Sequence, residues 1–398
     1  MLRILTLSVS FLAAQSAAGQ NWFFNKTDVT QDSLPVKSFL QLRYQLGGIA
    51  DTKTAGVHYI DSNPFQSVDV RYGVYGYGRK KWHQLHHYPT YGIGISKFMF
   101  QPKDNILGNP FTTYLFFNES VFKFKKSSVG YDFSVGLAYH WKPYDQYTNP
   151  EQKVIGSPVT AYVAMGVQYD FKFSDRFDAT LGISINHFSN GRIRSPNRGL
   201  NLYALNSSLR YRLGPVRPAH KSKDISFKES KQVTYVLDSF RPMIEFYTVA
   251  SAGAVTTFQD INNRSLYYLA ASGSIDVARH YRPSGKYGLG FDWSYDESLK
   301  VVYQNDYPSG AVPSYLLNWP GVHLSHEYLI HRWTFITQAG INLKVVGDKG
   351  IGYGRIALRY DLTKSIFLRV GVRVHHSVTS DFIEWGAGYS YYKMKTGK

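Results

Sequence analysis

The feature that most restricts the fold of this chain is a recurring alternation of apolar and polar residues with a period of two. In the segment 163–169 every odd position is apolar or aromatic, namely Val163, Met165, Val167 and Tyr169. Successive side chains of a strand point to opposite faces, so this pattern indicates strands with one apolar face. Beyond the first residues no apolar run reaches the roughly 18 residues that a membrane helix needs. Any membrane span in this chain must therefore be a β-barrel.

The alternating segments fall into two groups of about eight, separated by a polar stretch. The first group lies near 38–48, 66–78, 90–101, 111–123, 129–140, 159–171, 178–189 and 201–213. The second lies near 240–252, 264–278, 284–296, 316–329, 332–346, 351–361, 365–376 and 381–393. Eight strands are enough to close a small membrane barrel. We predict an all-β, transmembrane antiparallel β-barrel of eight strands in the first half and a second barrel-like repeat; the alternative is one sixteen-stranded barrel.

Four regions follow from this division. Residues 1–19 resemble an export signal, with Arg3, an apolar run over 4–14 and the small residues Ala17, Ala18 and Gly19 before the expected cleavage site. Residues 20–213 should form the first barrel and carry the chemistry. Residues 214–239 are charged and contain prolines, which is typical of a linker. Residues 240–398 should form the second, non-catalytic repeat.

Composition and charge narrow the class of partner. Aromatic residues make up 16% of the chain and cysteine is absent, so disulfides and thiolate metal sites are excluded. The mean hydropathy of -0.28 suits strands that turn every second residue to a polar lumen, although a secreted soluble β protein would share it. A net charge of +17 favours an anionic partner. In an exported chain without a nucleic-acid-binding motif, we expect lipid headgroups of the bacterial outer membrane and no nucleic acid.

The segment 178–201 carries the chemistry. Its odd positions are apolar up to Ile185 and continue as His187 and Ser189, which puts these two side chains on one face, roughly 7 Å apart at Cβ. A polar loop follows, and alternation resumes with Asn201 on the face shared with Tyr203. If the two strands form a hairpin, His187, Ser189 and Asn201 meet at one rim.

These residue types suit nucleophilic catalysis. A serine hydroxyl needs an imidazole to take its proton, and the imidazole needs a third group to hold its tautomer. Ser189 would be the nucleophile, His187 the general base and then acid, and Asn201 the orienting residue. Oxyanion donors could come from Asn190, Gly191, Asn197 or Gly199. The loop arginines Arg192, Arg194 and Arg198 could meet substrate phosphates. The competing interpretation is an interfacial strand with a solvated loop.

The same residues resemble a known signature. The run His187-Phe188-Ser189-Asn190-Gly191, with Pro196-Asn197-Arg198-Gly199 and Asn201, resembles the active site of the outer-membrane lipid A 3-O-deacylases and related acyloxyacyl-hydrolase-like proteins. The resemblance implies an eight-stranded barrel with a His-Ser-Glu triad on its lipid-facing surface. It also implies a hydrolase, an esterase that removes an acyl chain from lipopolysaccharide. Asn201 stands at the position of the family glutamate.

Two alternative functions accompany this resemblance. The spacing is also similar to that of outer-membrane phospholipase A, whose triad is His-Ser-Asn and which requires calcium. Wider motifs, including Trp141-Lys142-Pro143-Tyr144-Asp145 and Phe382-Ile383-Glu384-Trp385-Gly386, resemble the longer deacylase-like proteins of Bacteroidetes-type bacteria. We therefore favour the deacylase, without a cofactor; calcium enters only under the phospholipase alternative. A porin or structural barrel is the non-enzymatic alternative.

Histidines in two other parts of the sequence could serve as a second catalytic base or as metal ligands. The second half repeats the strand pattern with His376 at the position of His187, but Val378 replaces the serine, so this copy lacks a nucleophile. His83, His86 and His87 could in principle hold a metal. Three histidines in a basic turn more often form a solvated rim, so we predict no metal site.

Overall fold

The computed structural model describes residues 38–50, 64–76, 80–101, 106–214, 240–257, 266–375 and 379–394. The predicted export signal and nearly all of the predicted linker lie outside these residues. Within the described ranges, no helix is long and apolar enough to cross a membrane.

The first half closes into a barrel of eight antiparallel strands. Each strand pairs with its neighbours in the chain, and β1 pairs with β8 to complete the circle. A short helix, α3 (Lys81–Leu85), lies between the second and third strands. The strands are β1 (Ser38–Ile49), β2 (Pro64–Tyr75), β3 (Thr90–Phe100), β4 (Gly108–Lys123), β5 (Ser127–Trp141), β6 (Val159–Lys172), β7 (Phe177–Ser189) and β8 (Leu200–Arg212).

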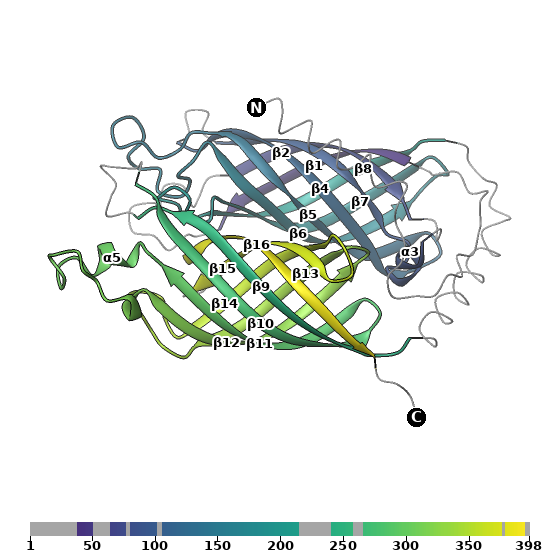
Figure 1. Cartoon of the computed structure of the whole chain (residues 1–398). Coiled ribbons are helices and arrows are strands. Elements are labelled where there is room, and N and C mark those ends of the chain that lie inside the picture. Colours follow the sequence, from purple (N-terminus) through teal and green to yellow (C-terminus); the bar gives the residue numbers. More distant parts are fainter. Residues whose placement is uncertain are drawn as a thin grey trace.

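The second half closes independently, with β16 paired to β9. Its strands are β9 (Met243–Val255), β10 (Tyr268–Arg282), β11 (Gly285–Asp296), β12 (Asn318–Ile330), β13 (Trp333–Asn342), β14 (Gly352–Asp361), β15 (Ile366–His375) and β16 (Thr379–Met394). The helices α5 (Leu299–Val302) and η3 (Ser314–Leu316) follow β11. Figure 1 shows the two barrels side by side. The two-barrel prediction is confirmed, and the sixteen-stranded alternative is wrong.

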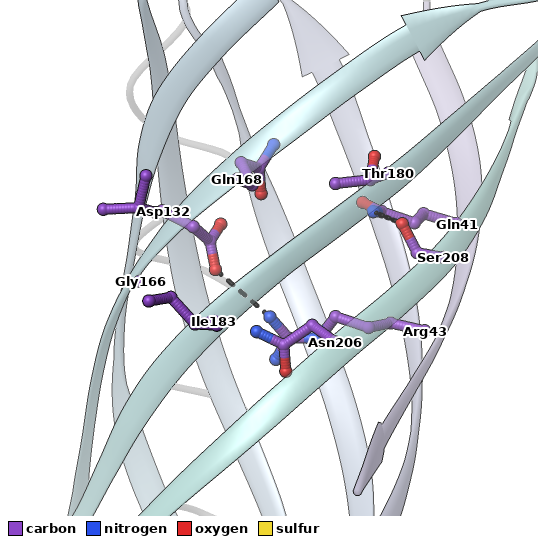
Figure 2. Close-up of a pocket in the computed structure, with 10 residues that line it drawn as sticks. Gln41, Arg43, Asp132, Gly166, Gln168, Thr180, Ile183, Asn206 and Ser208 are labelled. Carbon is purple, nitrogen blue, oxygen red and sulfur yellow. Dashed lines mark hydrogen bonds and ion pairs between the residues drawn. The ribbon is translucent and has the colours of Figure 1, made fainter.

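Charged side chains fill the lumen of the first barrel. Arg71 Nη1 lies 2.8 Å from Asp132 Oδ1, and Arg43 Nη1 lies 3.2 Å from Asp132 Oδ2. Arg43 also pairs with Asp69. Figure 2 shows a small pocket inside this lumen, where Arg43 reaches Asp132. The pocket is lined mainly by polar and charged residues of the lumen and by none of the predicted site residues.

The second lumen is filled in the same way. Lys286 Nζ lies 2.5 Å from carboxylate oxygens of both Glu245 and Glu327, and Arg359 lies 2.8 Å from Glu245. All four side chains are buried. Buried charges are tolerated when each is paired and hydrogen-bonded. The alternation along the strands thus separates an apolar, lipid-facing outside from a charged, packed inside, which leaves no aqueous channel in a barrel of this size.

The two ends of the barrels differ in the length of their connections. At one end the strands are joined by the short turns 124–126, 173–176, 283–284, 331–332 and 362–365, and the longer connection 76–89, which contains α3, is the exception there. The opposite end carries the long connections 142–158, 190–199, 297–317 and 343–351. Outer-membrane barrels have short periplasmic turns and longer external loops. The 190–199 loop follows the predicted nucleophile Ser189 and is hereafter called the nucleophile loop. It therefore lies at the external end.

A hydrogen-bonded cluster joins the barrels at the periplasmic end. The Glu119 carboxylate accepts hydrogen bonds from Tyr131 of the first barrel (2.6 Å) and Tyr328 of the second (2.5 Å). His86 Nδ1 lies 3.0 Å from the same carboxylate, and His86 Nε2 donates to the Leu329 carbonyl at 2.8 Å. One carboxylate on β4 thus holds groups from both barrels.

This cluster corrects the expectation of a solvated histidine rim. His83 and His86 are buried, because α3 packs where the barrels meet and Trp82 stacks on His331. Burial, aided by nearby Lys80, lowers the pKa of His83 to about 3, so this imidazole is neutral. His87 remains half exposed and bonds Glu119 at 2.8 Å. No group of metal-ligating side chains with suitable geometry occurs in the described part of the chain.

We predict that Tyr328→Phe lowers the free energy of unfolding by about 1–3 kcal/mol, because a buried carboxylate loses a hydrogen-bond donor. Urea unfolding in lipid vesicles would measure the change. Tyr287→Phe is the matched control, since Tyr287 is on the outer face of β11, 60% exposed, and should have little effect. An equal shift in both variants would show that Tyr328 does not link the barrels.

Candidate active site

The predicted site residues lie on the β7–β8 hairpin. His187 is directly opposite Asn201 in the strand register, and opposed side chains on one face of an antiparallel pair are neighbours. The His187 Nδ1 atom lies 2.7 Å from Asn201 Oδ1. The face is the outer one, because Leu181, Ile183 and Ile185 on the same face of β7 are 60–63% exposed. The imidazole and its amide partner therefore stand at the end of a lipid-facing stripe.

The amide partner fixes the state of the imidazole. An amide oxygen can only accept a hydrogen bond, so His187 Nδ1 carries the proton in this contact. The lone pair of the neutral ring is then on Nε2. His187 can act as a base through Nε2 while Nδ1 remains bound to Asn201.

Ser189 ends β7 and already faces two hydrogen-bond donors. Its Oγ accepts from the backbone N–H of Gly191 at 3.1 Å and from Asn197 Nδ2 at 2.9 Å. Within the described residues, no hydrogen bond joins Ser189 to His187. Catalytic hydrogen bonds often shorten only when substrate binds. The hydroxyl proton is thus free for a base that approaches on the same face.

The four candidate oxyanion donors separate into two pairs. Gly191 and Asn197 direct N–H groups at the Ser189 oxygen. The Asn190 side chain instead donates to the Arg194 carbonyl at 2.9 Å, and the Gly199 N–H donates to the Val154 carbonyl at 3.0 Å. The N–H groups of Asn190 and Gly199 thus hold the loop together, and the assignment of these two residues as oxyanion donors stays a prediction that these contacts do not support.

Gly199 also has a steric role. Its backbone φ of +76° lies in the left-handed region that favours glycine. A Cβ added there would lie 3.0 Å from His187 Cε1 and 3.6 Å from Ser189 Cβ. A side chain at position 199 would thus press on the imidazole and crowd the nucleophile.

The three loop arginines also differ from one another. Arg192 Nη2 lies 3.0 Å from Asp296 Oδ2 and 2.6 Å from Ser298 Oγ, both in the second barrel. The Arg192 guanidinium is thus already paired with a carboxylate, which does not favour its predicted role as a phosphate ligand. Arg194 is half-buried and Arg198 is exposed. These two are better placed for contact with an anionic lipid, and the role of all three stays a prediction.

Sequence reasoning missed the second-barrel residues that touch the nucleophile loop. They are Thr256, Asp296, Ser298 and Ile383. Ile383 belongs to the motif 382–386 noted in the sequence, but nothing in the sequence indicates that it or the other three lie beside Ser189, since they follow it by many residues and belong to another barrel. The predicted repeat positions His376 and Val378 lie outside the described residues. The neighbouring His375 points into the second lumen and lies 3.0 Å from Asp381.

Comparison with known families agrees with this division of the chain. Residues 44–210 match the family described as lipid A 3-O-deacylase. The first barrel is therefore similar to this family. Residues 244–393 match the family described as acyloxyacyl hydrolase, C-terminal domain, so the two matches correspond to the two barrels. Together the two matches indicate a hydrolase of the bacterial outer membrane.

Solved structures give weaker likenesses. The outer membrane enzyme PagL is 12% identical, with 42% of this chain and 97% of that chain covered and a TM-score of 0.31. A triple mutant of the Rhodopseudomonas blastica porin is 10% identical over 90% of this chain and 100% of its own, with a TM-score of 0.18. An outer membrane channel from Pseudomonas putida F1 is 9% identical over 91% and 97%, with a TM-score of 0.21. No curated protein matches in sequence.

We predict that Asn197→Ala lowers kcat for ester hydrolysis by about 100-fold or more, the usual cost of removing one oxyanion donor. KM should change little, because the contact strengthens only as charge develops. Steady-state kinetics of acyl release would measure both constants, with heat-modifiable migration on gels as the check of folding. An unchanged kcat would remove Asn197 from the site.

Proposed function

We propose that this protein removes an ester-linked acyl chain from the lipid A of lipopolysaccharide, with Ser189 as its nucleophile. The observation that carries the proposal is the 2.7 Å contact between His187 and Asn201 on the outer face, beside a serine that faces two N–H donors. The match of residues 44–210 to the lipid A 3-O-deacylase family supports the same substrate.

The reaction follows from these groups. Ser189 Oγ attacks the ester carbonyl while its proton passes to His187 Nε2. The tetrahedral oxyanion accepts hydrogen bonds from Gly191 and Asn197. Collapse breaks the ester bond, and the departing alkoxide takes the proton from His187. Water then hydrolyses the acyl-serine through the same two proton transfers, which frees the fatty acid and restores Ser189.

The outward position of the site defines how the substrate arrives. The exposed stripe of Leu181, Ile183 and Ile185 leads along the barrel wall to Ser189, so acyl chains can lie against it while the headgroup stays at the external rim. Arg194 and Arg198 are available for the lipid phosphates. Each charge-assisted contact would contribute on the order of 1–3 kcal/mol.

We predict that Ser189→Ala and His187→Ala abolish acyl release, whereas Asn201→Ala leaves partial activity. An uncharged orienting group stabilises the imidazolium less than a carboxylate does, so Asn201→Glu should retain or raise activity. Mass spectrometry of lipid A from cells that carry each variant is the measurement. An unchanged acyl count with wild type and Ser189→Ala alike would remove the assignment.

We also propose that the reaction needs no cofactor, since a base, an orienting group and two donors are available in the chain. Addition of EDTA should therefore leave acyl release unchanged, and the rate with and without added calcium is the measurement. Calcium dependence together with loss of phospholipid chains would move the assignment to a phospholipase. Steady ion conductance without esterase activity would favour a porin, against the packed lumens described above.

A further inference from the structure

We propose that the second barrel is part of the catalytic apparatus, because it positions the oxyanion donors of the first. This inference rests on the proposed function and extends it to the C-terminal domain. The residues that carry it act through the nucleophile loop and are positioning residues. They contact residues 191–195, the segment between the two donors Gly191 and Asn197.

The first contact is a set of three hydrogen bonds at Thr256, just after β9. The Ser195 N–H donates to Thr256 Oγ1 at 2.7 Å, and the Ser195 hydroxyl donates to the Thr256 carbonyl at 3.1 Å. The Thr256 N–H donates to the Arg192 carbonyl at 3.1 Å. Thr256 is 3% exposed. These bonds fix the loop backbone at two points in a site that water does not reach freely.

The second contact is the ion pair of Arg192 with Asp296, at the end of β11. Asp296 is 1% exposed and also lies 2.8 Å from Lys349. Ser298 Oγ accepts a further hydrogen bond from the same guanidinium. Asp296 is buried and is held in place by β11 and Lys349, so its pair with Arg192 is screened less than a surface ion pair. The pair therefore ties the loop to the end of β11.

The third contact lies at Gly191 itself. Its φ is +58°, and an added Cβ would lie 2.3 Å from Ile383 Cγ1 on β16. The backbone whose N–H faces Ser189 is thus pressed against the wall of the second barrel. Glycine is required here because only a residue without Cβ fits the gap and the left-handed conformation.

The rest of the loop is held by the first barrel. The Arg198 and Gly199 N–H groups donate to the Lys153 and Val154 carbonyls in the 142–158 loop. In the segment 191–195 the first barrel contributes the hydrogen bond from Asn190 Nδ2 to the Arg194 carbonyl at 2.9 Å. This segment is therefore held by both barrels, whereas the N–H groups of 198–199 bond the first barrel. A displacement of about 1 Å at a catalytic group can cost on the order of 100-fold in rate. Loosening the second-barrel contacts should accordingly lower kcat and leave KM nearly unchanged.

The test uses the full chain and a pair of substitutions at Thr256. Thr256→Val keeps the shape and removes the hydroxyl that accepts the Ser195 N–H, whereas Thr256→Ser keeps it. With lipopolysaccharide in detergent micelles, we expect Thr256→Val to lower kcat about 10- to 100-fold with KM within about twofold. Thr256→Ser should stay close to wild type. Labelling of Ser189 by a fluorophosphonate probe should slow in parallel with kcat.

Two further variants complete the design. Arg192 lies in a loop of the first barrel, outside every strand, and Arg192→Gln should lower kcat as Thr256→Val does. If Thr256→Val fails to fold, Arg192→Gln alone tests the inference. Glu297→Gln is the matched control, because Glu297 adjoins Asp296 but pairs with Lys300 at 2.9 Å. It removes a charge beside Asp296 without touching the loop and should behave as wild type.

The outcomes separate this inference from the proposed function. Wild-type kcat in both Thr256→Val and Arg192→Gln, with Ser189→Ala inactive, would overturn the positioning role and leave the esterase assignment intact. A rise in KM alone would also overturn it. Activity in Ser189→Ala equal to wild type would instead reject the proposed function.

Discussion

Closure of each sheet is the constraint on which the rest of this structure depends. In a bilayer every backbone N–H and C=O must find a partner within the protein, and a strand can do so only if its sheet has no free edge. The pairings of β1 with β8 and of β9 with β16 supply that closure. Once the sheet is closed, the two-residue period decides which side chains meet lipid. His187, Ser189 and Asn201 fall on the lipid side, so the candidate site opens to the membrane and not to the lumen.

The same period explains where the charge of the chain resides. Lumen positions carry arginines, lysines, aspartates and glutamates that pair with one another across each barrel, such as Arg71 with Asp132 and Lys286 with Glu245. Buried pairs of this kind add little net stability, but removal of one partner is costly. Packed lumens therefore make both barrels stiff. Two stiff bodies in contact can hold a loop between them more firmly than one barrel could hold it alone.

The sequence predicted strands and contacts correctly where the interacting residues are close together in the chain. Strand positions followed from alternation, and the meeting of His187 with Asn201 followed from one hairpin with one register. Contacts between barrels could not be predicted in this way. The partner of Arg192 lies 104 residues away, and nothing near Arg192 distinguishes a basic loop residue that binds lipid phosphate from one that pairs with a distant carboxylate. The burial of His86 by Tyr328 and Leu329 could not be predicted from the sequence for the same reason.

The asparagine at position 201 suits the place where the site lies. Asn201 is exposed on the outer surface, next to a stripe that faces hydrocarbon, and an ionised carboxylate near the interface carries a desolvation cost that a neutral amide avoids. The amide still fixes the tautomer of His187, because its oxygen can only accept. What it gives up is the electrostatic stabilisation of the imidazolium in the transition state. In the proposed reaction, a site with a weaker third member depends more on its oxyanion donors, so the accuracy with which Gly191 and Asn197 are held would be the larger determinant of rate. That dependence gives a physical reason for a second barrel pressed against the nucleophile loop.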